Sequence, residues 1–189
     1  MPHLRPLGAA LVASLIAVAA PRPAGACLNA VQLETKEAAR LVAKVEAALD
    51  EGKPKKAYYL IPGELEVSDR ALQRRLEVLQ AVARLRIGHV TIALGMLAQH
   101  VKQRPDDPYL VARLAEAQTT AGKNLDEALA RLVDLEKRDV MPDAEGWATL
   151  ARLYDGKGDA AGRERAVARC KQIAKRAEVC AVGGKVASR

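Results

Sequence analysis

Apolar residues recur every three or four positions along most of the chain, with polar residues between them. The clearest stripes lie in residues 41–49, 72–83 and 110–121. This spacing is typical of an amphipathic α-helix that buries one face, because a helix completes a turn every 3.6 residues. The pattern predicts a chain of consecutive helices and an all-α fold.

Capping residues mark where two of these helices begin. Asp107 precedes Pro108, so a side-chain acceptor at the N-cap is followed by a proline at the first helical position. The segment from Asn124 to Glu127 resembles a capping box, in which the glutamate reaches back to a free N–H. Both segments predict helix starts.

Two further starts are less sharply defined. Ser68 or Asp69 can cap the helix that runs to about residue 87. The first helix begins either near Ala30, after a similar capping box, or at Thr35. The sequence leaves both alternatives open.

Glycines recur at positions 52, 88, 122 and 158, with spacings of 36, 34 and 36 residues. After each of the first three, an alanine five or six residues later opens a second apolar run. A period in the mid-thirties indicates stacked helical hairpins. The predicted repeat domain covers residues 27–177, in units of about 38–73, 74–107, 108–143 and 144–177, with a tail at 178–189.

The last unit carries Trp147, Leu150, Ala151 and Tyr154, followed by a Gly-Asp turn at Gly158. These residues and their spacing resemble the tetratricopeptide repeat (TPR) family, and the other units match in part. The resemblance covers roughly residues 38–177. It implies a superhelical stack of about four antiparallel helical hairpins, with both aromatic side chains in the core.

In TPR proteins the first helix of each hairpin lines a concave surface that binds a protein or peptide. The resemblance therefore implies a non-enzymatic interaction module with a partner-binding surface on these helices. The alternative is a solvated face without a dedicated ligand. The implied partner-binding residues are Arg75, Val78, Val82, Arg86, Tyr109, Glu116 and Arg152, together with Val42 and Glu46.

Residues 1–26 have the pattern of a secretory signal peptide. Arg5 precedes an apolar run over residues 7–20, and Ala24 to Ala26 are small, as a cleavage site requires. The run is shorter than the ~20 residues that span a bilayer. We therefore expect an exported protein, periplasmic or extracellular, rather than a retained anchor helix.

Cys27 directly follows the predicted cleavage site, which is where a bacterial lipoprotein carries its lipid. The alternative to simple export is thus a membrane-tethered structural envelope protein anchored through Cys27. Lipoprotein signals usually place Leu three residues before the cysteine, whereas this chain has Ala24. Simple export is the preferred interpretation.

Export permits disulfide bonds. Cys170 lies on the apolar face of the last predicted helix and Cys180 lies just beyond its end. A chain that turns back over that helix can bring their Cα atoms within the ~6 Å that a disulfide requires. We expect a Cys170–Cys180 disulfide, with two buried free thiols as the alternative.

The formal net charge of +7 is unevenly distributed. Residues 162–189 carry a net charge of +6, whereas residues 27–161 carry −1. The basic C-terminal helix predicts either attraction to an anionic envelope surface or a polar cap for the stack. Nucleic acid is not expected as a partner, because aromatic residues do not alternate with the basic ones.

The composition contains few candidates for catalysis. The chain has only five aromatic residues, and Ala and Leu predominate, which excludes an all-β fold. After the signal peptide, Ser68 and Ser188 are the only serines, and His89 and His100 the only histidines. Neither pair forms a catalytic or metal-binding motif. We expect no catalytic residues, no metal and no cofactor.

Overall fold

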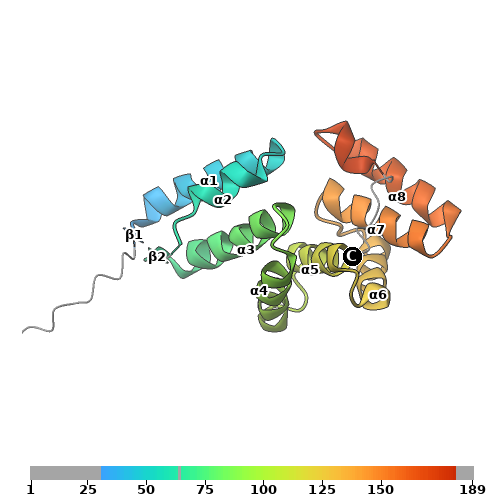
Figure 1. The fold of residues 1–189 in the computed structure, drawn as a ribbon, viewed down its shortest axis with the longest axis horizontal. Helices are drawn as coiled ribbons and strands as arrows, with labels where there is room; N and C mark the ends of the chain where they lie inside the picture. Colours follow the sequence, from blue (N-terminus) through green and yellow to red (C-terminus); the bar gives the residue numbers. More distant parts are fainter. Residues whose placement is uncertain (1–30, 64, 182–189) are drawn as a thin grey trace, which may run out of the picture.

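The structure is a computed structural model that describes residues 31–63 and 65–181. The described chain is mostly helical, which confirms the all-α prediction. Figure 1 shows the helices along an arc, with the α1–α2 pair and α8 on either side of its opening. The helices are α1 (Thr35–Asp50), α2 (Pro54–Leu60), α3 (Arg70–Arg86), α4 (Val90–Gln103), α5 (Pro108–Ala121), α6 (Leu125–Lys137), α7 (Ala144–Gly156) and α8 (Ala160–Ile173), followed by the 3-10 helix η1 (Ala177–Cys180).

Two predictions fall outside the described residues. These are the signal peptide at residues 1–26 and the lipidation alternative at Cys27. The last eight residues of the predicted tail also fall outside them. The first residues of that tail are described, and Cys180 and the two residues before it belong to η1.

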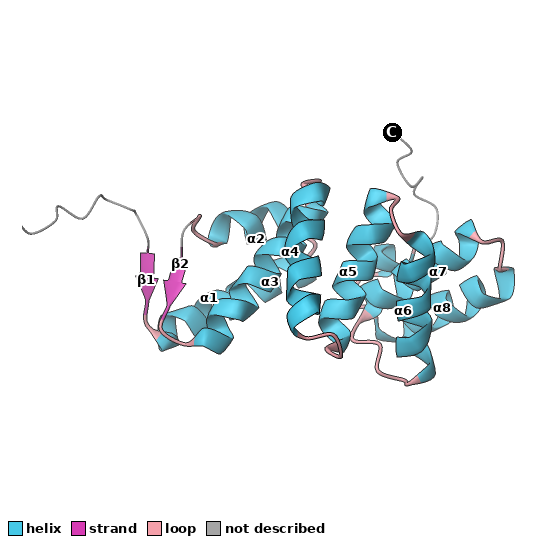
Figure 2. Cartoon of the chain, turned by 90° about the horizontal axis from the view of Figure 1, so that it is seen from below, coloured by secondary structure: helices cyan, strands magenta, loops and turns pink. Residues whose placement is uncertain are grey.

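Two short strands lie at the N-terminal end of the row of helices (Figure 2). β1 (Val31–Leu33) pairs in parallel with β2 (Leu65–Val67), and Val31 lies opposite Leu65. The extended conformation of β1 places the start of the first helix at Thr35 and not near Ala30. Strands of three residues are too short to give a periodic signal in the sequence, so the prediction missed them.

The recurring glycines end the first helix of each pair. Gly52, Gly88, Gly122 and Gly158 all have positive φ, between 63° and 96°. After each of them, the next residue donates its N–H to a carbonyl five residues earlier, as in Lys123 to Gln118 (3.0 Å). This is the Schellman arrangement, which needs a left-handed residue and therefore favours glycine. The repeat seen in the sequence is thus a repeated helix-ending turn.

Aspartate side chains cap four of the eight described α-helices, namely α3, α5, α7 and α8. The side chain of Asp69 accepts hydrogen bonds from the N–H groups of Ala71 and Leu72, which settles the choice between Ser68 and Asp69. Asp107 caps α5 in the same way, as predicted. Both caps satisfy N–H groups that the helix itself leaves free.

The predicted capping box at Asn124 is wrong. Asn124 has a left-handed conformation (φ 53°) and its side chain makes no capping hydrogen bond. Glu127 does not reach back toward the helix start, because it accepts a hydrogen bond from Gln118 on α5 (3.0 Å) and pairs with Arg131 (2.8 Å). A contact between helices therefore replaces the local one.

Three apolar clusters follow one another along the arc, and neighbouring clusters share a helix. The first joins α1, α2 and α3, the second α3, α4 and α5, and the third α5 to α8 with η1. Trp147 and Tyr154 are buried in the third cluster, as expected. The alanines that let the helices approach are fully buried, namely Ala81, Ala93, Ala115, Ala128 and Ala151.

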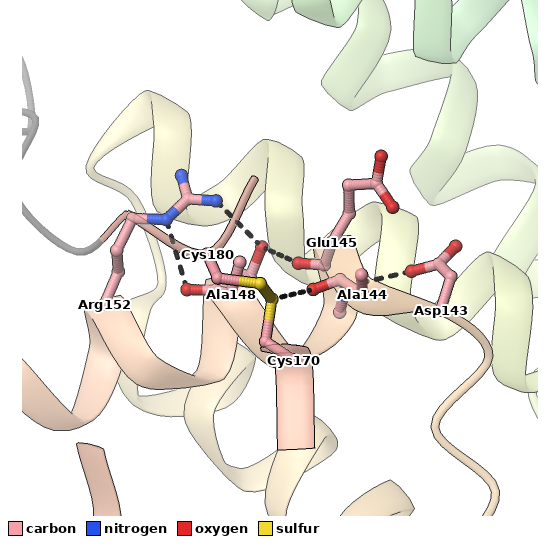
Figure 3. Close-up of a disulfide and its surroundings, with 9 residues drawn as sticks. Asp143, Ala144, Glu145, Ala148, Arg152, Cys170 and Cys180 are labelled. Carbon is pink, nitrogen blue, oxygen red and sulfur yellow. Dashed lines mark hydrogen bonds between the residues drawn. A yellow bond between two sulfur atoms is a disulfide. The ribbon is translucent and has the colours of Figure 1, made fainter. Parts of the chain in front are cut away.

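The predicted disulfide is present between Cys170 and Cys180, whose Cα atoms are 5.8 Å apart. Figure 3 shows it beside the first turns of α7, where the Cys170 Sγ atom lies 3.3 Å from the carbonyl oxygen of Ala144. The bond holds the segment that follows α8 against the apolar core. Ile173, the last residue of α8, is 50% exposed.

The turn glycines can be tested against a glycine inside a helix. We expect Gly122→Ala to destabilise the protein by about 1–2 kcal/mol, because an L-residue is strained in the left-handed conformation. Gly95→Ala, at an exposed position within α4, should stabilise it by about 1 kcal/mol through helix propensity. Neither added Cβ meets an atom within 4 Å. Urea unfolding of both variants measures the difference, and equal stabilities would contradict the assigned turn.

Candidate partner-binding surface

The odd-numbered helices form one continuous layer. α1 packs against α3, α3 against α5, and α5 against α7. We call the side of this layer that faces the opening of the arc the inner face. Ion pairs and cation–π contacts cross this layer from helix to helix and join several of its charged side chains into a connected network.

The network begins at Glu46 on α1. Its Oε1 atom accepts hydrogen bonds from Nε and Nη2 of Arg75 on α3, at 2.8 and 2.6 Å. The Arg75 guanidinium also lies 4.6 Å from the centre of the Tyr109 ring on α5, and Arg113 lies 5.4 Å from the same ring. Tyr109 thus joins two arginines through cation–π contacts.

Arg113 is fully buried at the centre of the network. It donates hydrogen bonds to Glu116 on the same helix and to Asp143, the N-cap of α7. The Asp143 oxygen that Arg113 contacts also accepts the N–H of Gly146, at 2.9 Å. One buried arginine therefore ties α5 to the capping residue that starts α7.

Arg86 extends the network from α3. Its Nε lies 3.4 Å from Glu116 and its Nη2 lies 3.4 Å from Glu145 on α7. Glu116 therefore lies between Arg86 and Arg113, and it is only 7% exposed. Arg86 thus links α3 to α5 through Glu116 and to α7 through Glu145.

The surroundings keep this cluster ionised. Burial by itself lowers the pKa of Arg113, but the attraction of Glu116 and Asp143 outweighs it, and the net pKa shift is upward. Burial also raises the pKa of Glu116, whereas Arg113 and Arg86 lower it, so the net pKa shift is downward. Burial raises the pKa of Tyr109, which stays a neutral phenol. The paired charges thus stabilise one another where water is excluded.

The predicted partner-binding residues fall into two groups. Val78 and Val82 are 2% and 1% exposed and belong to the apolar clusters, so they offer no surface to a partner. They were expected on the inner face, but that side of α3 packs against its neighbouring helices. Glu116 is buried as well, at 7% exposed. Six side chains remain half-buried on the inner face: Val42, Glu46, Arg75, Arg86, Tyr109 and Arg152.

Sequence reasoning missed Arg113 and Asp143. The only local signal is the spacing of Arg113 and Glu116, since residues three apart on a helix can pair. Such pairs usually lie on the surface, and nothing in the sequence indicates that this arginine is buried. Asp143 is 30 residues away from Arg113, so the contact depends on how two hairpins stack.

Hollows lie on both sides of the stack. One of about 180 Å³ lies beside Tyr109 on the inner side and is lined partly by Arg74, Arg75 and Arg104. A larger one of about 660 Å³ lies between α4, α5 and α6, where Leu94, Ala98 and Val101 supply apolar walls. The inner hollow is thus basic and the outer one mostly apolar.

Most of the described basic side chains in the C-terminal helix and the segment after it are already in ion pairs with acidic side chains. Arg163 pairs with Asp155 and Arg169 with Asp139. Beyond α8, Lys175 pairs with Asp50 and Arg176 with Glu178. Among the described basic residues from position 162 onward, those outside any ion pair are Arg165 and Lys171.

Residues 31–63 and 65–181 contain no group of three or more His, Cys, Asp or Glu side chains placed to hold a metal ion. In the same residues, no helix is both long and apolar enough to cross a membrane. No protein-family model, curated protein or solved structure matches the chain.

The buried arginine can be tested by substitution. We expect Arg113→Met to destabilise the protein by about 3–5 kcal/mol, because it leaves two carboxylates without their buried partner. Arg131→Met is the control, since it breaks the more exposed Arg131–Glu127 pair and should change the stability by less than about 1 kcal/mol. Denaturant unfolding measures both. A loss for Arg113→Met no larger than that of the control would refute its structural role.

The lowered pKa of Glu116 makes stability depend on pH. The stabilisation that its charge provides is complete above the ordinary pKa of 4.5 and is lost as the pH falls through the lower folded-state pKa. Glu116→Gln should therefore destabilise the protein most at neutral pH, and its difference from the parent should shrink in acid. Unfolding curves recorded across this range test the sign. A difference independent of pH would contradict it.

Proposed function

We propose that the chain is a non-enzymatic protein–protein interaction module built as a TPR-like stack of four helical hairpins. Three observations support the stack: the glycine turns near a period of 35, the shared apolar clusters, and the continuous layer of odd-numbered helices. The TPR resemblance itself depends on the residues of the last unit, Trp147 through Gly158.

The partner of this proposal is a protein or peptide that lies along the inner face. The observation that carries it is the row of half-buried side chains Arg75, Tyr109, Arg86 and Arg152 over α3, α5 and α7. Half-buried arginine and tyrosine are enriched where proteins bind one another, since they combine apolar contact with hydrogen bonding. The hollow beside Tyr109 offers room for a partner side chain.

We also propose that the module acts in the bacterial cell envelope or outside it. The signal-like residues 1–26 and the Cys170–Cys180 disulfide support export, because disulfides persist in oxidising compartments. Attachment through lipidated Cys27 is the alternative proposal for a tethered envelope protein. Contact with an anionic surface has weaker support, because most of the basic residues described beyond position 162 are already in ion pairs.

The inner face can be distinguished from the outer one by cross-linking. A photoreactive residue at Val42 or Arg152 on the inner side should form adducts with the partner in cells of the source organism. The same residue at Ala98, which lines the outer hollow, should form none. Adducts from Ala98 alone would overturn the proposal.

Charge reversal on the identified partner then tests Arg75 itself. Arg75→Glu should weaken binding by about tenfold, which corresponds to about 1.4 kcal/mol. Glu46→Arg combined with Arg75→Glu restores the ion pair between the two positions, while the charge at position 75 stays reversed. If the double variant regains full affinity, Arg75 acts only through its contact with Glu46.

A further inference from the structure

Side-chain contacts cross the opening of the arc between its two ends. Lys175, just beyond α8, donates a hydrogen bond from Nζ to Oδ2 of Asp50 at the end of α1, at 2.6 Å. The next residue, Arg176, lies so close to Gly52 that a side chain at position 52 would collide with its guanidinium. The hydrogen bond joins residues 125 positions apart in the sequence.

This contact is not part of a larger packed interface. Among the described elements that pack extensively, no pair joins α1 or α2 to α7 or α8. In Figure 1 the α1–α2 pair and α8 lie on opposite sides of the opening. The long side chains of Lys175 and Arg176 therefore span a gap that the helices themselves leave open.

One end of the crossing segment is firmly fixed. Cys180 is 3% exposed and is bonded to Cys170 on α8, and Val179 packs against the third apolar cluster. Figure 3 shows Cys180 beside Arg152 and Ala148 of α7. We call residues 174–181 the strap. Its C-terminal part is held by a covalent bond and by burial.

The other end is held weakly. The side chains of Lys175 and Asp50 are 76% and 56% exposed, so water and salt screen their attraction. Glu145 on α7 adds a second carboxylate near Lys175, and with Asp50 it holds the pKa of Lys175 above its ordinary value. The difference between the two ends means that the exposed contact breaks first.

We propose that the strap is a latch, which closes the arc through Asp50–Lys175 and opens it when that ion pair is released. A hollow of about 300 Å³ lies beneath it, lined partly by Asp50, Glu145, Ile173 and Lys175. The latch can regulate the protein only if the proposed partner binding holds, because the closed arc would restrict a partner's access to the inner face. The opening motion itself needs no partner and can be measured alone.

Spin labels on the two sides of the opening measure the motion. Cysteines replace the exposed residues Lys55 on α2 and Lys171 on α8, in a full chain carrying Cys27→Ser so that no other free thiol is present. Double electron–electron resonance should give one short distance in low salt. In 1 M NaCl, where the Debye length falls to about 3 Å, the distribution should shift to longer distances.

Variants separate the latch from general effects. Lys175→Gln should give the longer distances even in low salt, and Asp50→Lys with Lys175→Asp should restore the short one. Asp126→Asn is the matched control, since it breaks the exposed pair between Asp126 on α6 and Lys157 just after α7 and should leave the distance unchanged. Circular dichroism confirms that each variant is folded.

Three results would overturn the latch. These are a Lys175→Gln distribution identical to that of the parent, a distribution that salt does not change, and an equal shift in Asp126→Asn. None of them bears on whether a partner binds the inner face. Likewise, failure of the cross-linking experiment would leave the latch intact.

Discussion

Each helical pair in this chain has an apolar side that only the next pair can cover. α3 and α5 meet this requirement by contributing to two apolar clusters each, one toward either end of the arc. A helix shared in this way cannot leave one cluster without exposing the other. The fully buried alanines matter for the same reason, because larger side chains would separate the shared helices.

The inner face adds an electrostatic constraint to this apolar one. Arg113 binds Glu116 on its own helix and the N-cap of α7, so the start of one hairpin is fixed by a charge buried in the previous one. Glu116 and Glu145 then connect the same region to Arg86 on α3. A partner that used these charges would have to replace bonds already made within the protein. This requirement favours specific partners over merely charged ones.

The two ends of the arc are held by contacts of different strength. The Cys170–Cys180 bond and the buried Cys180 side chain fix the strap to the last hairpin. The strap meets the end of α1 through the exposed Asp50–Lys175 pair, and Arg176 approaches Gly52 in the turn that follows. Such a combination allows the ends to separate while each hairpin stays folded, because the separation exposes little apolar surface.

Local patterns in the sequence determined the helices, the four glycine turns, the aspartate cap at Asp107, and the cysteine pair. Each depends on residues within about ten positions, where helix geometry and backbone conformation dominate. Only the tertiary structure decided that Val78 and Val82 are core residues, that Arg113 is buried, and that Lys175 meets Asp50. These outcomes depend on how hairpins stack and curve, and the same side chain is buried or exposed according to which neighbour covers it.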